Sequence, residues 1–210
     1  LFNHCWALVG RTDILERLHA FVQSRRRVAV LYGRGTSGKT KVLFEFSKEF
    51  KSRHQGQALL FLREGITLNE DTIKQVPAQP TTIVIDDAQR CTDLKFLLNA
   101  AQQYPDRIKL VLSARPQGKH FIRTSLSETG FDIEEIDDLG ELGNLGLKDL
   151  KELARQVIGR EREHLVDPLV GATKASPLHT VLPPRLQAHK AIHPKLSAQQ
   201  PKFQYPVLRP

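Results

Sequence analysis

The octapeptide GRGTSGKT at residues 33–40 has the residue types and spacing of a loop that holds phosphate. Glycines let backbone N–H groups turn toward an anion, Lys39 can place a positive charge on the β- and γ-phosphates, and the Thr40 hydroxyl can bind Mg²⁺. The helix that follows adds the positive end of its dipole. The residues that we expect to contact a nucleotide in this loop are Gly33, Gly35, Thr36, Ser37, Gly38, Lys39 and Thr40.

The contact set ends at Thr40, the last residue of the motif. We expect no nucleotide contact from position 41. Position 41 lies beyond the motif, and the chain has a lysine there, Lys41.

A pair of carboxylates, Asp86 and Asp87, follows the apolar run at residues 81–85. Asp86 lies 46 residues after Thr40 (86 − 40), which leaves room for one intervening strand and helix. A carboxylate at this place can hold Mg²⁺ opposite Thr40, and the next acid can orient or deprotonate an attacking water. Two acids can also simply end a strand, but the upstream loop favours catalysis. We therefore predict that Lys39, Asp86 and Asp87 are catalytic and that Thr40 and Asp86 are the metal ligands.

Arg115 is the third candidate, because it follows the apolar run at residues 109–113. Its position predicts that it emerges at the same edge of a sheet as Asp86. A guanidinium there can contact the γ-phosphate and so report its presence. An exposed loop arginine is the alternative, and the position after a strand favours the catalytic role.

Hydrophobic periodicity predicts the elements that must position these residues. Continuous apolar runs are typical of buried parallel strands, and they occupy residues 28–32, 58–62, 81–85 and 109–113, with 131–136 as a possible fifth. Helical spacing predicts helices at residues 13–23, 39–54, 94–101 and 147–158, and one turn around 68–76. Thr12 or Asp13 can cap the first helix. The alternation predicts an α/β fold with a parallel sheet flanked by helices and the loop at the carboxyl end of its first strand.

Composition and charge narrow the range of functions. The chain has 210 residues with 40% hydrophobic and 26% charged residues, which is typical of a globular protein, and no apolar run is long enough to span a membrane. Cys5 and Cys91 give no disulfide framework, and no signal peptide is visible, so we expect a cytoplasmic location. The chain begins at Leu1 and contains no methionine, so we expect an excerpt of a larger protein.

The net charge of +8 is concentrated near the end of the chain. Residues 169–210 contain six Lys or Arg and no Asp or Glu, so residues 1–168 hold 25 basic and 23 acidic residues, a net charge of +2. A nearly neutral body argues against a face that binds duplex nucleic acid. The basic segment can still contact nucleic acid or an acidic partner, although a solvated end is the favoured interpretation.

The order of these motifs resembles that of the STAND class of P-loop ATPases, which is related to the AAA+ and NB-ARC domains. The family's entry signature is similar to residues 8–13, LVGRTD, and its Walker A motif is similar to residues 33–40. Its Walker B motif resembles IVIDD at 83–87, and its sensor arginine resembles Arg115 in SAR at 113–115. Its late Gly-x-Pro-Leu element resembles ASPL at 175–178, with Ala175 in place of the glycine. The tandem Asp86-Asp87 favours STAND over most AAA+ proteins, and the likeness covers about residues 7–182.

The resemblance implies a slow, Mg²⁺-dependent ATPase that acts as an ADP/ATP switch. ADP would hold a closed state, and ATP would open it and drive self-association through the ATPase domain. Effector and sensor domains would lie outside this chain. The resemblance also implies nucleotide contacts from Val9, Gly10, Arg11 and Pro177. No arginine finger is identifiable, which favours slow hydrolysis or help from a neighbouring subunit.

The resemblance also implies a division of the chain into three parts. Residues 1–138 would form the P-loop ATPase domain and residues 139–182 a helical lid subdomain. Residues 183–210 are rich in proline and would begin a further domain or form a disordered tail.

Other functions stay open at this point. An AAA+-like ATPase that acts on nucleic acid, of the origin-recognition or transposition-helper type, is the main alternative. A nucleotide-binding scaffold without turnover is another. A small-molecule kinase ranks lower because of the tandem acids and the helical segment, and guanine specificity has no support because no N-K-x-D motif is present.

Overall fold

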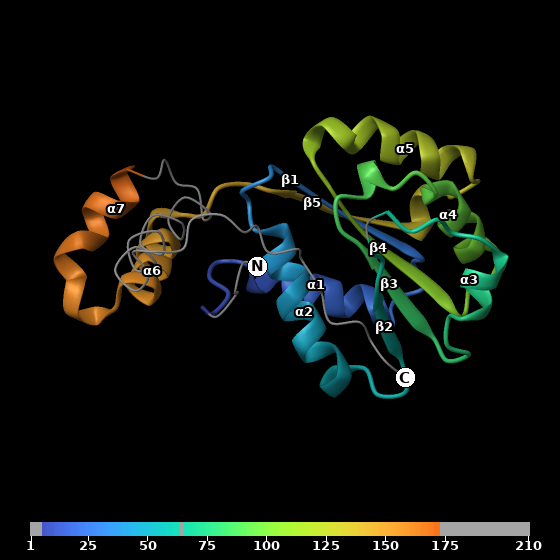
Figure 1. The fold of residues 1–210 in the computed structure, drawn as a ribbon, viewed down its shortest axis with the longest axis horizontal. Coiled ribbons are helices and arrows are strands. Elements are labelled where there is room, and N and C mark those ends of the chain that lie inside the picture. Colours follow the sequence, from blue (N-terminus) through green and yellow to red (C-terminus); the bar gives the residue numbers. More distant parts are fainter. Residues whose placement is uncertain (1–5, 64, 173–210) are drawn as a thin grey trace, which may run out of the picture. The chain divides into compact units, whose positions relative to one another are not determined.

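A computed structural model describes residues 6–63 and 65–172, and its centre is a five-stranded parallel sheet (Figure 1). The strands lie in the order β2-β3-β4-β1-β5, and every pairing is parallel. Their bounds are β1 (Val28–Gly33), β2 (Ala58–Phe61), β3 (Thr81–Ile85), β4 (Ile108–Ala114) and β5 (Ile136–Leu142). Because the sheet is parallel, the carboxyl ends of the three central strands meet at one edge, and that edge positions the candidate site.

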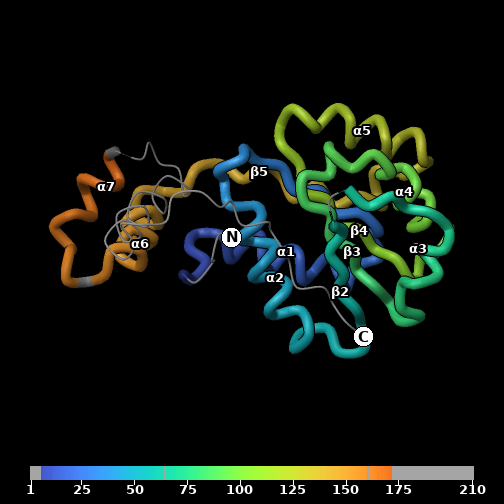
Figure 2. Tube along the Cα trace, in the orientation of Figure 1, coloured from blue at the N-terminus to red at the C-terminus, as the bar shows by residue number. Residues whose placement is uncertain are grey.

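Helices alternate with the strands and cover both faces of the sheet, as the trace in Figure 2 follows. The neighbours α1 and α2 lie on one face, and α3, α4 and α5 pack on the other. The bounds are α1 (Thr12–Gln23), α2 (Lys39–Arg53), α3 (Glu70–Lys74), α4 (Leu94–Gln103) and α5 (Lys119–Glu128). Short 3-10 helices are η1 (Ala88–Arg90), η2 (Pro116–Gly118) and η3 (Ile133–Glu135). The predicted α/β fold is therefore confirmed.

The chain divides into two compact units, and the sheet belongs to the unit Arg11–Gly143. The other unit comprises Leu1–Gly10 and Asn144–Pro210. Its described helices are α6 (Leu147–Ile158), η4 (Arg160–Leu165) and α7 (Val166–Ala172). These helices enclose a small apolar core against which Trp6 and Val9 pack. In the first unit, β5 continues the sheet to Leu142. This is four residues beyond residue 138 (142 − 138), where we expected the ATPase domain to end.

Burial explains why the central strands could be predicted from the sequence and the last strand, β5, could not. Every residue of β1 and β3 is buried, so β1 is largely an apolar run and β3 consists of β-branched residues only. The edge strand β5 buries fully only Leu139 and Leu142, and acids occupy most of its other positions. The predicted fifth strand at 131–136 was therefore wrong: η3 occupies residues 133–135 of that segment, and the strand begins at Ile136.

Two helix predictions also need correction. Neither Thr12 nor Asp13 caps α1, because the helix begins one residue earlier than predicted and both lie inside its first turn. The residue before the helix is Arg11, and no side chain caps this end. Helix α5 was not predicted, since it buries only three residues, Ile122, Ser125 and Leu126.

A lysine from the sheet holds the end of α1. Lys109 of β4 donates through Nζ to the carbonyls of Phe21 (3.2 Å), Val22 (2.9 Å) and Ser24, and it stands 5.2 Å from the centre of the Phe21 ring. Burial lowers the pKa of this amine. A cation at a helix C-terminus satisfies carbonyls that lack helical partners and interacts favourably with the dipole.

Replacing Lys109 with methionine is expected to lower the free energy of unfolding by about 2 kcal/mol, because part-buried carbonyls lose their donor. Chemical denaturation of the purified chain measures this. The matched control is Lys51→Met on an exposed position of α2, for which we expect a change within about 0.5 kcal/mol. Equal effects of the two substitutions would contradict the assigned role.

A network of two histidines joins α1 to the end of α2. Gln23 Nε2 lies 2.8 Å from His54 Nδ1, and His54 Nε2 lies 2.8 Å from His19 Nδ1. His19 Nε2 in turn lies 3.3 Å from Glu49 Oε2. Because the amide of Gln23 donates, both rings fit as neutral tautomers that carry the proton on Nε2.

The charges around this network favour the neutral rings. Burial lowers the pKa of His19 most, Arg53 lowers it further, and Glu49 and Glu16 oppose the change. Burial also lowers the pKa of His54, followed by His19 and Arg53. The folded protein therefore binds fewer protons at these rings than the unfolded chain does.

The free energy of unfolding is expected to be insensitive to these rings above about pH 6.5, their ordinary pKa, and to fall as the pH decreases below it. The sign follows because the unfolded state takes up the protons first. Denaturation between pH 5 and 8 measures the slope. His54→Gln keeps a donor to His19 and should flatten the slope, whereas His120→Gln at an exposed position should not. A wild-type slope in His54→Gln would contradict the assignment.

Candidate nucleotide-binding site

The predicted phosphate loop connects β1 to α2. Its turn is tight, because the Ser37 N–H and hydroxyl both donate to the Arg34 carbonyl, at 3.1 and 2.9 Å. A Cβ at Gly33 would collide with the Ser37 hydroxyl. Gly38 precedes the helix with φ of +96°, a conformation that favours glycine. The loop thus delivers the N–H groups at the start of α2 to the sheet edge, where an anion can bind.

Lys39 is directed back across this loop. Its side chain is buried, and Nζ donates to the carbonyls of Gly33 (2.8 Å) and Arg34 (3.3 Å). Burial lowers its pKa, Asp87 and Asp86 raise it, and Arg115 lowers it. The buried cation is therefore held by loop carbonyls, and a bound phosphate would offer it a stronger, charged partner.

The two predicted metal ligands lie in contact. The Thr40 hydroxyl donates to Asp86 Oδ2 at 2.7 Å, across the boundary between α2 and the end of β3. The other oxygen of Asp86 accepts from the Ser113 hydroxyl and from the Asp87 N–H (3.1 Å). One hydroxyl and one carboxylate are hard oxygen ligands, as Mg²⁺ prefers when phosphates and water complete its shell. No cluster of three or more His, Cys, Asp or Glu suited to a metal occurs within the described segments.

Lys41 directly follows the phosphate loop. Lys41 lies in the first turn of α2, and its amine pairs with the Glu45 carboxylate one helical turn later. The same amine stands 5.6 Å from the centre of the Phe44 ring. These contacts direct the side chain along α2, and the expected lack of a nucleotide contact from Lys41 stays a prediction.

Asp87 and Arg115 face each other beside the contact between Thr40 and Asp86. The backbone of Asp87 has a left-handed conformation, with φ of 51°. Among the described residues, Asp87 is the one non-glycine residue with positive φ. Arg115 Nη2 lies 3.4 Å from Asp87 Oδ2. The guanidinium carbon is also 3.6 Å from where a Cβ of Gly35 would stand. Arg115 therefore extends from Asp86 and Asp87, which we call the acidic loop, to the phosphate loop.

The loop opens onto a hollow of about 450 Å³. Two guanidinium groups and one carboxylate contribute to its lining, which comprises Arg34, Gly35, Arg115, Pro116, Gln117 and Glu141. Positive charge therefore surrounds the outer side of the phosphate loop, with an acid opposite.

Two residues of this site were not predicted from the sequence. Ser113 is fully buried at the end of β4 and donates to Asp86, and Gln89 Oε1 accepts the Arg115 backbone N–H at 3.2 Å. A polar residue at the end of an apolar strand was a usable signal for Ser113. Gln89 gave none, because its role depends on a contact between segments distant in sequence.

The remaining predicted contact residues lie elsewhere in the chain. Val9 packs in the helical unit, and Gly10, with φ of +62°, belongs to the same unit. A Cβ at Gly10 would collide with the Asp149 carboxylate, so this glycine has a packing role. Arg11 belongs to the sheet unit and donates to the Gly143 carbonyl. Pro177 lies outside the described residues, and its nucleotide contact stays a prediction.

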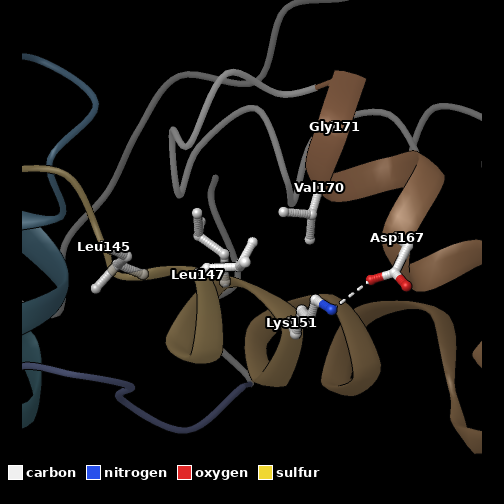
Figure 3. Close-up of a pocket in the computed structure, with 7 residues that line it drawn as sticks. Leu145, Leu147, Lys151, Asp167, Val170 and Gly171 are labelled. Atoms are coloured by element: carbon white, nitrogen blue, oxygen red, sulfur yellow. Dashed lines mark ion pairs between the residues drawn. The ribbon is translucent and has the colours of Figure 1, made fainter.

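The helical unit has a hollow of its own, of about 460 Å³ (Figure 3). Apolar side chains from the start of α6 and from α7 line it, and Lys151 pairs with Asp167 at 2.8 Å on one side. Its lining residues are Leu145, Leu147, Leu150, Lys151, Asp167, Val170 and Gly171. The apolar lining distinguishes this hollow from the phosphate loop.

The fold and this edge are those of a P-loop nucleotide-binding domain. A family profile described as Novel STAND NTPase 5 matches residues 7–120, which is 114 of the 210 residues. The chain belongs to this STAND family, and the predicted resemblance is confirmed. Comparison with curated proteins finds no significant match.

Three solved structures illustrate the likeness in fold. The Hsp104–ADP complex of S. cerevisiae has a TM-score of 0.63 and 14% identity, over 83% of this chain and 30% of that one. Thermotoga maritima RuvB, a Holliday junction branch migration motor, has 0.60 and 15%, over 88% and 64%. Aeropyrum pernix ORC2, in ADPNP–ADP complexes, has 0.63 and 16%, over 88% and 64%. The chain therefore spans less than two thirds of each relative, and the likeness establishes the fold.

A separate property concerns the membrane. Within residues 6–63 and 65–172, no helix combines the length and apolar character needed to cross a bilayer.

The backbone at Asp87 predicts an unusual order of stabilities. Asp87→Gly is expected to be more stable than Asp87→Ala by about 1 kcal/mol, because alanine carries a Cβ into a left-handed conformation. Thermal denaturation of the nucleotide-free protein measures the difference. The same pair of substitutions at exposed Asp106, whose φ is not positive, should not favour glycine. Alanine at Asp87 as stable as glycine would contradict the backbone assignment.

Proposed function

We propose that this chain is a slow, Mg²⁺-dependent ATPase module that acts as an ADP/ATP switch. The observation that carries the proposal is the 2.7 Å hydrogen bond between Thr40 and Asp86, which joins the phosphate loop to the acidic loop. Membership of a STAND NTPase family supports nucleotide turnover. Adenine is favoured because Hsp104 and ORC2 are named as complexes with ADP or an ATP analogue.

Nucleotide binding would exchange partners within the site. The N–H groups around Gly38 and the amine of Lys39 would hold the β- and γ-phosphates, and Lys39 would leave the carbonyls of Gly33 and Arg34. Thr40 and Asp86 would hold Mg²⁺, which when bound would neutralise charge on the phosphate oxygens.

Asp87 would act as the general base, and Arg115 would control it. In the present arrangement Arg115 pairs with Asp87 Oδ2 and so occupies one oxygen of its carboxylate. The γ-phosphate would attract Arg115 and leave Asp87 free to take a proton from water. The water oxygen would then bond to the γ-phosphorus while the bond to the β-phosphate oxygen breaks, releasing ADP and phosphate.

The same exchange would make the module a switch. ADP lacks the phosphate that competes with Asp87 for Arg115, so the two nucleotides would stabilise different positions of Arg115. A difference in affinity between two states is what a nucleotide switch requires. Self-association through the ATPase domain, effector and sensor domains outside this chain, a lid that includes Pro177, and a cytoplasmic location complete the proposal.

An ATPase that acts on nucleic acid is the second candidate. The observation that favours it is the fold shared with RuvB, a branch migration motor, together with the basic residues 169–210. A salt-dependent shift of DNA by this chain would favour it. No shift at low salt would leave the regulatory switch as the better account.

Lys39→Ala is expected to weaken binding of ADP and of an ATP analogue by about 100-fold, because the buried cation that faces the phosphates is lost. Asp87→Asn is expected to keep ADP affinity and to slow phosphate release by about 100-fold, the contribution of a general base. Calorimetric titration and a phosphate-release assay measure these effects, with exposed Lys51→Ala as the control. Unchanged phosphate release in Asp87→Asn would instead support a non-enzymatic scaffold.

A further inference from the structure

We propose that Gln89 is the positioning residue for Arg115 and that it sets the preference of the site for ATP over ADP. This inference rests on the proposed function. Gln89 lies in η1, two residues after Asp87, and its side chain is half-buried. Gln89 Oε1 accepts the backbone N–H of Arg115 at 3.2 Å. The segment that carries the acids therefore also holds the backbone of the arginine that pairs with them.

The backbone turn at Arg115 is shaped around this side chain. The Arg115 carbonyl accepts the Gly118 N–H at 2.8 Å, which closes the turn of η2. A Cβ at Gly118 would stand 2.6 Å from Gln89 Cβ and 3.0 Å from Cγ. The φ of Gly118 is −81°, which any residue can adopt. Close approach of Gln89, and not backbone conformation, therefore accounts for a glycine at this position.

The side chain of Arg115 depends on this backbone anchor. It is 46% exposed, and its ion pair with Asp87 is long, at 3.4 Å. An exposed pair of this kind contributes little free energy and cannot by itself fix a long side chain. The hydrogen bond that the Arg115 N–H donates to Gln89 Oε1 holds the Arg115 backbone, and so determines whether the guanidinium reaches both Asp87 and the phosphate loop.

The hydrogen bond between Arg115 and Gln89 also links the candidate nucleotide site to α5. Helix η1 contacts both β4 and α5, and η2 leads directly into α5 at Lys119. If Arg115 exchanges Asp87 for the γ-phosphate as its partner, the exchange would act on the turn at residues 115–118, which the hydrogen bond to Gln89 holds. Gln89 thus couples the acidic loop to the helix that follows the arginine.

Gln89→Met tests the hydrogen bond, because methionine keeps the length of the side chain and removes the acceptor. The ADP affinity is expected to stay within about twofold, while the affinity for a non-hydrolysable ATP analogue and kcat each fall about fivefold, the effect of one lost hydrogen bond. Gly118→Ala displaces Gln89 by a different route and is expected to give the same pattern. The control is Gln103→Met at an exposed position of α4.

Hydrogen exchange of the Arg115 amide gives a readout that needs no nucleotide. The amide should be protected in the parent and in Gln103→Met, and should exchange faster in Gln89→Met and Gly118→Ala. Unchanged exchange, or equal losses of ADP and ATP-analogue affinity, would overturn the positioning role. If the parent binds no adenine nucleotide but the Arg115 amide still exchanges faster in Gln89→Met and Gly118→Ala than in the parent, the anchor is sustained, whereas the proposed function and the role in ATP preference are overturned.

Discussion

The carboxylate of Asp86 is the interaction on which the candidate site depends. One oxygen accepts from Thr40 at the start of α2, and the other accepts from Ser113 at the end of β4 and from the Asp87 N–H. Three segments distant in sequence therefore meet at one group. This meeting is possible because the sheet is parallel, which brings the carboxyl ends of β1, β3 and β4 to one edge.

The charges at this edge satisfy one another without a nucleotide. Lys39 donates to carbonyls of its own loop, Thr40 donates to Asp86, and Arg115 pairs with Asp87. The net free energy of nucleotide binding would therefore be the difference between the contacts that the nucleotide makes and the internal contacts that it replaces. Under the proposed function, the γ-phosphate would compete with Asp87 for Arg115, so a site of this kind would distinguish nucleotides that differ by one phosphate.

The elements and residues that buried strands and their carboxyl ends determine were predicted from the sequence, whereas those that depend on an interrupted apolar pattern or on a contact between two short helices were not. The central strands were predicted because both of their faces are buried, and Lys39, Thr40, Asp86 and Arg115 were expected at one edge, where the structure has them. The edge strand β5 was misplaced because acids interrupt its apolar pattern. The role of Gln89 could not be predicted, because it follows from the separation between η1 and η2, which no local pattern encodes.

The most direct test of the central claim is to identify the nucleotide that the purified chain retains. The chain would be isolated under native conditions with Mg²⁺, denatured, and its extract separated by chromatography. The account predicts retained ADP, released when Lys39 is replaced by alanine. Absence of retained nucleotide, together with no binding of ADP or ATP to the chain in the presence of Mg²⁺, would contradict it.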